Sequence, residues 1–334
     1  MKVLFIGGTG VISTAATRLA AERGIELYLL NRGQRGVDIP PAVKVIHGDI
    51  HKSAETAKAL KGHRWDAVVN WINFVPADIE RDIELFHGVT NQYIFISSAS
   101  VYQKPVSHYL ITESTPLANP HWEYSRNKIA CEERAMLAYR TQGFPITIVR
   151  PSLTYGDTLV PLAINSWNKS WTVVKRMLDG KKVIVHGDGS NLWTTTHNTD
   201  FARGILGLIG NAQTIGHAFH ITSDEVLTWD QHYQIVARTI GVAPNIVHIA
   251  TDTLIAFDRE NEGNLLGDKA ASVVFDNSKL KRFVPDFVAT TSFAQGMART
   301  IAWFQADPAR QVIDTAFDTW CDTTIAAYEK ALCK

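Results

Sequence analysis

The first half of the chain alternates short apolar runs with stretches whose apolar residues recur at helical spacing. The apolar runs predict strands at 2–6, 26–30, 43–47, 65–70, 92–98 and 145–150. Helices are predicted over 14–23, 77–86 and 124–140. Nearly continuous apolar strands that alternate with helices are typical of a parallel sheet covered on both faces. The pattern therefore predicts an α/β fold with a doubly wound parallel sheet.

A glycine-rich turn, with the sequence GGTGVIS over 7–13, joins the first strand to the first helix. A strand, such a turn, a helix and a second strand form the context in which a loop binds a dinucleotide pyrophosphate. Gly7 permits the tight turn, Gly10 lets the backbone approach the phosphates, and the helix N-terminus offers N–H groups to the anion. Ser13 replaces the usual third glycine and is small enough for close packing.

The second strand ends in Asn31 and Arg32. In NAD-binding proteins of this type, an acidic residue at this place usually binds the ribose hydroxyls. Asn31 carries no charge that would repel a 2′-phosphate, and Arg32, with Arg35 close behind, can pair with one. The segment therefore favours NADP over NAD, although solvated loop arginines are the alternative interpretation.

Polar residues also follow the later strands. Asp49 and Ile50 come after the third strand, Asn70 ends the fourth, and Ser98 ends the fifth. Because ligands bind such sheets at the carboxyl ends of the strands, we expect these residues to lie at one site.

Tyr124 and Lys128 open the next helix, and their spacing of four places both side chains on one face. A phenol with a pKa near 10 is a poor base at neutral pH. A neighbouring ammonium and the positive ring of an oxidised nicotinamide would stabilise the phenolate and make it usable. Ser98 could hydrogen-bond the same substrate oxygen. An ordinary helix face is the alternative for Tyr124 and Lys128 taken alone.

After Pro151 the alternation loosens and aromatic residues become more frequent. Short strands are predicted over 182–186 and 218–221, and helices over 166–179, 200–210, 228–240 and 291–305. We expect a Rossmann-type dinucleotide-binding domain over 1–155, to which a segment at about 190–225 returns. A smaller, mixed C-terminal substrate domain would comprise 156–190 and 226–334.

Composition excludes several classes of function. The 334 residues contain 33 basic and 33 acidic side chains, so the basic footprint of a nucleic-acid-binding protein is missing. The three cysteines are scattered, which indicates neither a disulfide framework nor a metal site. No apolar run approaches the roughly 20 residues of a membrane span, and a strand starting at residue 2 leaves no room for a signal peptide. We expect a cytoplasmic protein that binds no metal, membrane or nucleic acid.

Taken together, these motifs resemble the extended short-chain dehydrogenase/reductases, the superfamily of NAD(P)-dependent sugar epimerases and dehydratases. The resemblance covers nearly the whole chain. It rests on GGTG at 7–10, GDI at 48–50, ISSASVY at 96–102, Tyr124 with Lys128, RPSLTYG at 150–156, GDG at 187–189 and FDNSK at 275–279.

The resemblance implies a role for each of these residues. Tyr124 would be the catalytic acid or base, Ser98 would hold the reacting oxygen, and Lys128 would bind the nicotinamide ribose and lower the pKa of Tyr124. A homodimer through the helices at 77–87 and 124–140 is also implied. The expected cofactor-binding residues are Gly7, Gly10, Val11, Ile12, Asn31, Arg32, Asp49, Ile50, Asn70 and Lys128.

Two departures from the family pattern bear on the substrate. Trp193 stands where members that act on nucleotide sugars usually carry an arginine for the diphosphate, and a tryptophan cannot neutralise phosphate. The nearby Arg176, Lys181 and Lys182 could substitute for it. Ala99 and Ser100 follow Ser98 where sugar 4,6-dehydratases have an Asp-Glu pair, so the groups for eliminating water are missing.

We therefore expect an NADP- or NAD-dependent oxidoreductase or epimerase that acts on a sugar or a sugar-like carbonyl compound or alcohol. Hydride returned to the other face of the substrate would give epimerisation, and exchange of the cofactor would give net oxidation or reduction. A nucleotide-sugar epimerase is one alternative. A non-catalytic or RNA-associated protein is another, because the chloroplast stem-loop RNA-binding proteins keep this fold and also lack the sugar-nucleotide signature.

Overall fold

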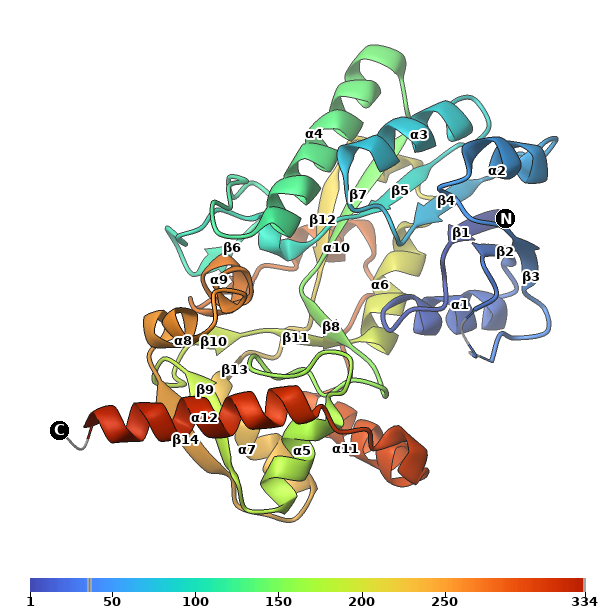
Figure 1. Ribbon diagram of the computed structural model, residues 1–334. Coiled ribbons are helices and arrows are strands. Elements are labelled where there is room, and N and C mark those ends of the chain that lie inside the picture. Colours follow the sequence, from blue (N-terminus) through green and yellow to red (C-terminus); the bar gives the residue numbers. More distant parts are fainter. Residues whose placement is uncertain (35, 37, 333–334) are drawn as a thin grey trace.

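The computed structural model describes residues 1–34, 36 and 38–332. Its centre is a seven-stranded sheet whose neighbouring strands are all parallel. The strands are β1 (Lys2–Ile6), β2 (Glu26–Asn31), β3 (Lys44–His47), β4 (Ala67–Asn70), β5 (Tyr93–Ile96), β7 (Ile146–Pro151) and β12 (Ala218–Ile221). They lie in the order β12-β7-β5-β4-β1-β2-β3. The order reverses between β1 and β4, so the predicted doubly wound parallel sheet is confirmed (Figure 1).

Helices cover both faces of this sheet. One face packs against α1 (Ser13–Glu22), α6 (Asn198–Leu208) and α10 (Ser278–Phe283). The other packs against α2 (Ser53–Leu60), α3 (Pro76–Phe86) and α4 (Glu123–Gln142). In β1 the residues Val3 to Ile6 are fully buried, because both faces of the strand are covered. The predicted helices at the N-terminus, before β5 and before β7 are therefore present within one or two residues of the expected ends.

A second body lies beyond the carboxyl ends of the strands. Its main helices are α5 (Trp171–Leu178), α7 (Trp229–Thr239) and α11 (Phe293–Gln305). They share an aromatic-rich core with Trp171, Trp193 and Trp229. Four two-stranded ladders complete it, pairing β8 (Leu153–Tyr155) with β11 (Thr195–His197), β9 (Lys182–His186) with β14 (Asn245–Ile249), β10 (Leu192–Trp193) with β13 (Leu227–Thr228), and β6 (Leu110–Ile111) with β15 (Val274–Phe275).

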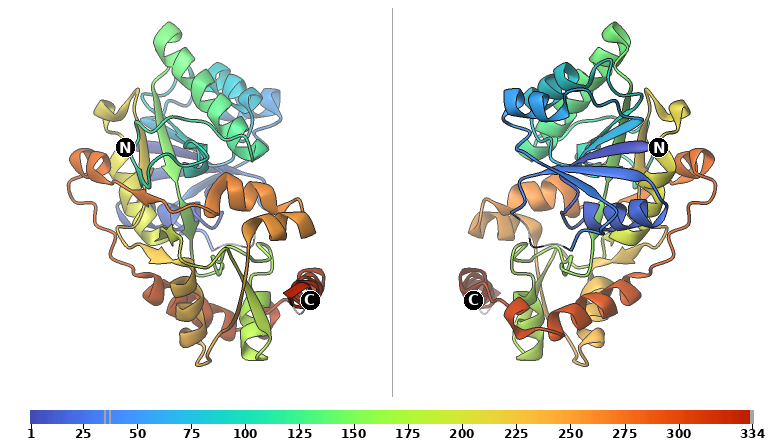
Figure 2. Two further views of the ribbon diagram at one scale, coloured as in Figure 1. Left: turned by 90° about the vertical axis from the view of Figure 1, so that its left-hand side faces the viewer. Right: turned by 90° about the vertical axis from the view of Figure 1, so that its right-hand side faces the viewer.

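The C-terminal third adds elements that the pattern did not predict. They include α8 (Thr251–Phe257), α9 (Asn261–Asn264), one π-helical turn η3 (Leu265–Lys269) and the long helix α12 (Thr315–Leu332). Figure 2 shows α12, in red, on the side of the molecule away from the main sheet. Its carboxylates bind cations of the β9 region: Arg176 and Lys181 pair with Asp318 and Asp322, and Lys182 pairs with Glu329.

The chain returns to the main sheet after it has entered the second body. Strand β12 pairs with β7 at the sheet edge, and α6 packs beside α1, as expected of the segment at about 190–225. Helix α10 also packs on the main sheet, although it lies within the range predicted for the substrate domain. The exact division into domain ranges stays a prediction. Within the described ranges, no helix has the length and apolar character needed to cross a membrane.

Candidate functional site

The turn after β1 is built on two glycines in a backbone conformation that other residues rarely adopt. Gly7 has φ +99° and Gly8 has φ +90°. A Cβ atom on Gly8 would lie only 2.7 Å from Cδ2 of Leu29, so the turn lies directly against β2. The tight turn expected at Gly7 is present. The close backbone approach also falls on Gly8, a residue to which the sequence analysis gave no role.

Hydrogen bonds hold the rest of this loop in place. Ser13 Oγ accepts a bond from the N–H of Gly10 at 2.8 Å, and Thr14 Oγ1 donates to its carbonyl at 2.7 Å. The carbonyl of Val11 accepts from Nδ2 of Asn198, at the start of α6, at 2.7 Å. The N-cap residue Ile12 has no side-chain oxygen to satisfy the first N–H groups of α1. The loop therefore fits an anion such as a pyrophosphate.

The end of β2 offers an unsatisfied donor. Asn31 Oδ1 accepts from the N–H of Gly33 at 2.9 Å, whereas Asn31 Nδ2 is buried and has no hydrogen-bond partner among the described residues. Arg32 is exposed. Arg35 lies outside the residues that the structure describes. A buried amide without a partner is costly, and a ribose hydroxyl would satisfy it. This too fits a dinucleotide.

The third strand ends next to this place. Gly48 donates its N–H to the carbonyl of Asn31 at 3.0 Å, so β3 and β2 end together. Asp49 Oδ1 accepts from the N–H of His51 at 3.1 Å, and Ile50 is almost fully buried. The side chain of Asp49 thus shapes the turn in which it lies.

Asn70 is turned into the protein. Its Nδ2 donates to Asp82 Oδ2 at 2.5 Å, and its Oδ1 accepts from the N–H of Ile72 at 2.8 Å. The side chain is fully buried. Asn70 therefore orders the loop after β4, and direct binding of a cofactor by its side chain stays a prediction.

Asp82, on α3, is the centre of a buried network that the sequence analysis missed. Besides Asn70, its carboxylate binds Asn73 Nδ2 at 2.8 Å, the hydroxyl of Tyr93, and Arg81 Nε at 2.9 Å. Burial raises the pKa of Asp82, and these partners oppose that rise. The network holds the loop after β4 against α3 and β5. No local pattern could have revealed it, because its members are up to 23 residues apart.

Ser98 lies directly after β5 and begins a chain of hydroxyl groups. Its Oγ is 2.9 Å from Ser100 Oγ, which in turn accepts from Ser125 Oγ at 2.7 Å. Ser100 and Ser125 are buried, and Ser98 is half-buried. The chain connects the end of β5 to the first turn of α4. The Asp-Glu pair of the dehydratases is thus replaced by a buried alanine and a serine engaged in this chain.

The structure brings Ser98, Tyr124 and Lys128 together. Tyr124, in the first turn of α4, lies near Ser98, whose hydroxyl acts to lower the pKa of the phenol. Lys128 Nζ lies 5.7 Å from the centre of the Tyr124 ring. It donates to the carbonyls of Asn73 at 2.5 Å and Ile96 at 2.8 Å. Lys128 therefore joins the loop after β4, the end of β5 and the helix that carries Tyr124.

Burial controls the acidity of both groups. It raises the pKa of Tyr124 to about 12, although the hydrogen bond with Ser98 acts in the opposite direction. It lowers the pKa of Lys128 to about 8. Tyr124 is therefore a protonated phenol at neutral pH in the protein alone. The expected lowering of its pKa would need a further positive charge next to the ring.

Four tryptophans that could line a substrate cavity have different environments. Trp193 is 2 % exposed and stacks on Trp229 with 5.7 Å between ring centres, and Trp171 is equally buried. Trp122 is half-buried, and its ring lies 4.9 Å from that of Tyr124. Trp167 is 40 % exposed. Trp193, at the place where an arginine was expected, therefore belongs to the core of the second body, whereas Trp122 borders the reacting group.

His121 and His197 have partners within the protein. His121 Nδ1 lies 3.3 Å from Glu262 Oε1. His197 Nδ1 caps α6 by accepting from the N–H of Thr199 at 3.4 Å, and its Nε2 lies 3.3 Å from Asp157 Oδ1. These contacts give both histidines a structural role.

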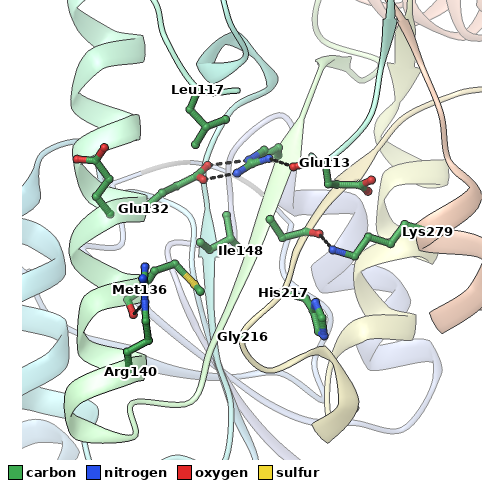
Figure 3. A pocket seen from close by; sticks show the side chains of 12 residues that line it. Glu113, Leu117, Glu132, Met136, Arg140, Ile148, Gly216, His217 and Lys279 are labelled. Carbon is green, nitrogen blue, oxygen red and sulfur yellow. Dashed lines mark hydrogen bonds and ion pairs between the residues drawn. The ribbon is translucent and has the colours of Figure 1, made fainter. Parts of the chain in front are cut away.

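A separate hollow of about 280 Å³ lies between α4 and strands β7 and β12 (Figure 3). Three of its charged groups, Arg150, Glu132 and Lys279, are bound within the protein. Arg150 donates to both carboxylate oxygens of Glu132, at 2.9 and 2.5 Å, and Lys279 donates to the carbonyl of Ala218 at 2.8 Å. We therefore assign it no chemistry.

Comparison with known proteins agrees with the predicted resemblance. Residues 3–222 match the model of the NAD dependent epimerase/dehydratase family. A dTDP-glucose 4,6-dehydratase of Actinoplanes is 26 % identical over 240 residues, which cover 70 % of this chain and 66 % of that protein. The chloroplast stem-loop binding protein of 41 kDa b of Arabidopsis thaliana is also 26 % identical, over 74 % of this chain and 65 % of its own length.

The fold is shared with a solved structure, that of dTDP-glucose 4,6-dehydratase from Bacillus anthracis in complex with NAD. The TM-score is 0.73 at 19 % identity, and the match covers 93 % of this chain and 98 % of the other.

Proposed function

Because the chain belongs to the NAD dependent epimerase/dehydratase family, we propose that it is an NAD(P)-dependent oxidoreductase or epimerase of a sugar or a sugar-like carbonyl compound or alcohol. One observation carries the proposal. Tyr124 lies near the hydroxyl of Ser98, and Lys128 lies one turn further along α4, bound to the loop after β4 and to the end of β5. Three groups that can handle one proton and one substrate oxygen therefore lie together.

The cofactor would lie over the carboxyl ends of β1, β2 and β4. Gly7, Gly10 and the first turn of α1 would bind the pyrophosphate, and Asn31 would bind the adenosine ribose through its unpaired Nδ2. Lys128 has used two of its three donors on backbone carbonyls, which leaves one for the nicotinamide ribose. When bound, the dinucleotide supplies a hydride acceptor or donor.

Tyr124 would move a proton to or from the substrate oxygen, while Ser98 holds that oxygen by a hydrogen bond. A phenol with a pKa near 12 is protonated at neutral pH, so donating a proton to a carbonyl is the easier direction. Accepting a proton from an alcohol requires positive charge near the ring to stabilise phenolate.

The substrate is proposed to be a free or simply substituted sugar, polyol or aldehyde. A buried diphosphate needs cationic partners. Trp193 is a core residue, and the three cations that could have replaced an arginine there are bound to carboxylates of α12. A nucleotide-sugar epimerase is the alternative that the dehydratase relative favours.

The cofactor is proposed to be NADP, because Arg32 is exposed beside an uncharged Asn31 and can reach a 2′-phosphate. We also infer a homodimer through α3 and α4, where Leu137 of α4 is 51 % exposed. Sedimentation analysis would test the dimer, and a monomer at micromolar concentration would contradict it.

An RNA-associated role is the second candidate, since a stem-loop binding protein is among the relatives. The zero net charge and the assembled Ser98, Tyr124 and Lys128 favour the enzyme. Salt-sensitive RNA retention without turnover would favour the RNA-binding role.

The test is turnover of a panel of free, oxidised and substituted sugars with NAD(H) and NADP(H), compared between the wild type and Tyr124→Phe. The variant should fold and bind cofactor normally but lose about two to four powers of ten in turnover, the range expected of a positioned proton-transfer group. Tyr328→Phe on α12 is the matched control and should keep full activity. Full activity of Tyr124→Phe on the substrate would contradict the assignment of Tyr124 as the proton-transfer group.

A further inference from the structure

A buried lysine, Lys104, lies against the π-helical turn η3 and has little to compensate its charge. Lys104 follows the short helix η1 (Ala99–Val101) and is 6 % exposed. Its Nζ donates one hydrogen bond, to the carbonyl oxygen of Asp268 at 3.1 Å, and lies 5.9 Å from the centre of the Trp193 ring. An ammonium has three donors, and within the described part of the chain the other two have no partner. Burial of such a cation is costly.

A second buried cation lies next to it. Lys269 is 3 % exposed, and its Nζ donates to Asp268 Oδ2 and to Asn264 Oδ1, both at 2.8 Å. It also lies over the rings of Trp122 and Trp167, 5.9 and 5.3 Å from their centres. Asp268 is thus bound by both lysines, by Lys104 through its backbone carbonyl and by Lys269 through its carboxylate. Two cations and one anion leave an excess positive charge in a desolvated place.

This cluster is joined to the reacting groups. Asn119 Nδ2 donates to the carbonyl of Ser100 at 2.8 Å and to that of Gly267 at 2.7 Å, which ties the π-helical turn η3 to the loop after Ser98. The ring of Trp122, under Lys269, lies against Tyr124. Burial, and to a lesser degree the charge of Asp268, raises the pKa of Tyr124. Isolated π-helical turns often occur at functional sites.

We propose that Lys104 and Lys269 bind an anionic group that the substrate itself carries, a carboxylate or a phosphate, beside the carbon that reacts at Tyr124. The inference rests on the proposed function and narrows it from sugars in general to sugar acids and sugar phosphates. An anion would accept the two unused N–H groups of Lys104 and balance the excess charge. In place of an arginine at position 193, the cation comes from Lys104, which lies over the Trp193 ring.

The test measures binding without turnover, in full-length Tyr124→Phe protein saturated with reduced cofactor. The probes for calorimetry are glucose, glucuronate, glucose 6-phosphate and UDP-glucose. Thermal shift with inorganic phosphate and with acetate reports on the anion alone. Each probe is measured with the Tyr124→Phe parent and with three variants of it, which also carry Lys104→Met, Lys104→Arg or the exposed control Lys58→Met.

We expect at least one anionic probe to bind Lys104→Met ten- to a hundredfold more weakly, as the loss of a charge-assisted contact predicts. Glucose should change by less than twofold. Lys104→Arg should keep most of the affinity, and Lys58→Met all of it. The midpoint of thermal unfolding of Lys104→Met without a probe should equal or exceed that of its parent, because an uncompensated buried charge is removed.

Two results would overturn the proposal. One is that every anionic probe and both small anions bind the parent and Lys104→Met equally well. The other is a lowered unfolding midpoint in Lys104→Met with unchanged anion binding, which would make Lys104 a structural residue.

Failure of the proposed function has a different signature. Lys104-dependent anion binding without turnover of any sugar would keep the anion site and refute the oxidoreductase. Turnover of neutral sugars at a rate that Lys104→Met does not change would support the oxidoreductase and refute the anion site. Preferential Lys104-dependent binding of UDP-glucose would keep the anion site and return the substrate to nucleotide sugars.

Discussion

Asp82 and Lys104 are both buried charged side chains, but their partners differ. Asp82 accepts hydrogen bonds from four side chains, those of Asn70, Asn73, Arg81 and Tyr93. Within the described part of the chain, Lys104 has one bond, to a backbone carbonyl. Where the chain satisfies a buried charge by itself, the charge organises the fold. Where it leaves donors unused, a ligand is the natural partner.

We expect the largest effect on stability from a substitution of Asp82. Asp82→Ala removes an acceptor that the amides of Asn70 and Asn73 share with Arg81, so we expect a loss of about 3–5 kcal/mol in the free energy of unfolding. Urea denaturation measures it. Glu84→Ala, an exposed position on the same helix, should change stability by less than about 0.5 kcal/mol. An equally small effect at Asp82 would mean that the network contributes nothing and that the contrast with Lys104 is false.

Lys128 is intermediate between Asp82 and Lys104, because this buried cation has two carbonyl acceptors. We expect its effect on the free energy of unfolding to depend on pH. Its pKa is about 8 in the folded protein against 10.5 when exposed. Between these values the unfolded chain binds more protons, so the unfolding free energy of the wild type should rise with pH relative to Lys128→Met.

The expected rise is about 2–3 kcal/mol between pH 7 and pH 10, and denaturation of both proteins at the two pH values measures it. Other titrating groups are common to both proteins and cancel in the difference. A difference that does not change with pH would show that Lys128 keeps an ordinary pKa.

The smallest expected effect concerns the unpaired amide of Asn31, the cofactor-side counterpart of the unused donors of Lys104. We expect NADP to bind about ten- to a hundredfold more tightly than NAD, the worth of one charge-assisted contact, and Asn31→Asp to reverse the preference. Calorimetry of both cofactors with stripped protein measures it. Asn91→Asp, an exposed site elsewhere, adds the same charge and should alter neither affinity. Tighter NAD binding by the wild type would contradict the prediction.

The sequence predicted the main sheet well because its strands are apolar on both faces, as Val3 to Ile6 of β1 are. Elements held by other forces were missed. Helix α2 buries only Thr56 and Leu60, too few for a periodic signal. Helix α12 buries Cys321 and Ile325 in an apolar cluster, a helical spacing that the sequence analysis did not use. It also forms ion pairs with residues about 140 positions earlier in the chain, and no local pattern reveals such contacts.

Motifs mark the positions of three candidate site residues. Ser98, Tyr124 and Lys128 lie together, because strand ends and helix spacing decide their positions, and their catalytic roles stay a prediction. The direction in which a side chain points was not predictable: Asn70 faces Asp82 within the protein. Lys104 and Asp268 carry no motif at all, and they meet only because the π-helical turn folds back over the loop after β5.

Asn119 has a consequence for any attempt to redesign this protein. By bonding Ser100 and Gly267 at once, it makes the turn beside the substrate and the loop beside the reacting oxygen a single mechanical unit. Gly263 and Gly267 lie so close to the Trp122 ring that an added Cβ would come within 2.4 and 2.8 Å of it. Residues 261–269 are therefore not an independent module. Grafting a relative's segment here would require its partners at 119 and 122 to be transferred with it.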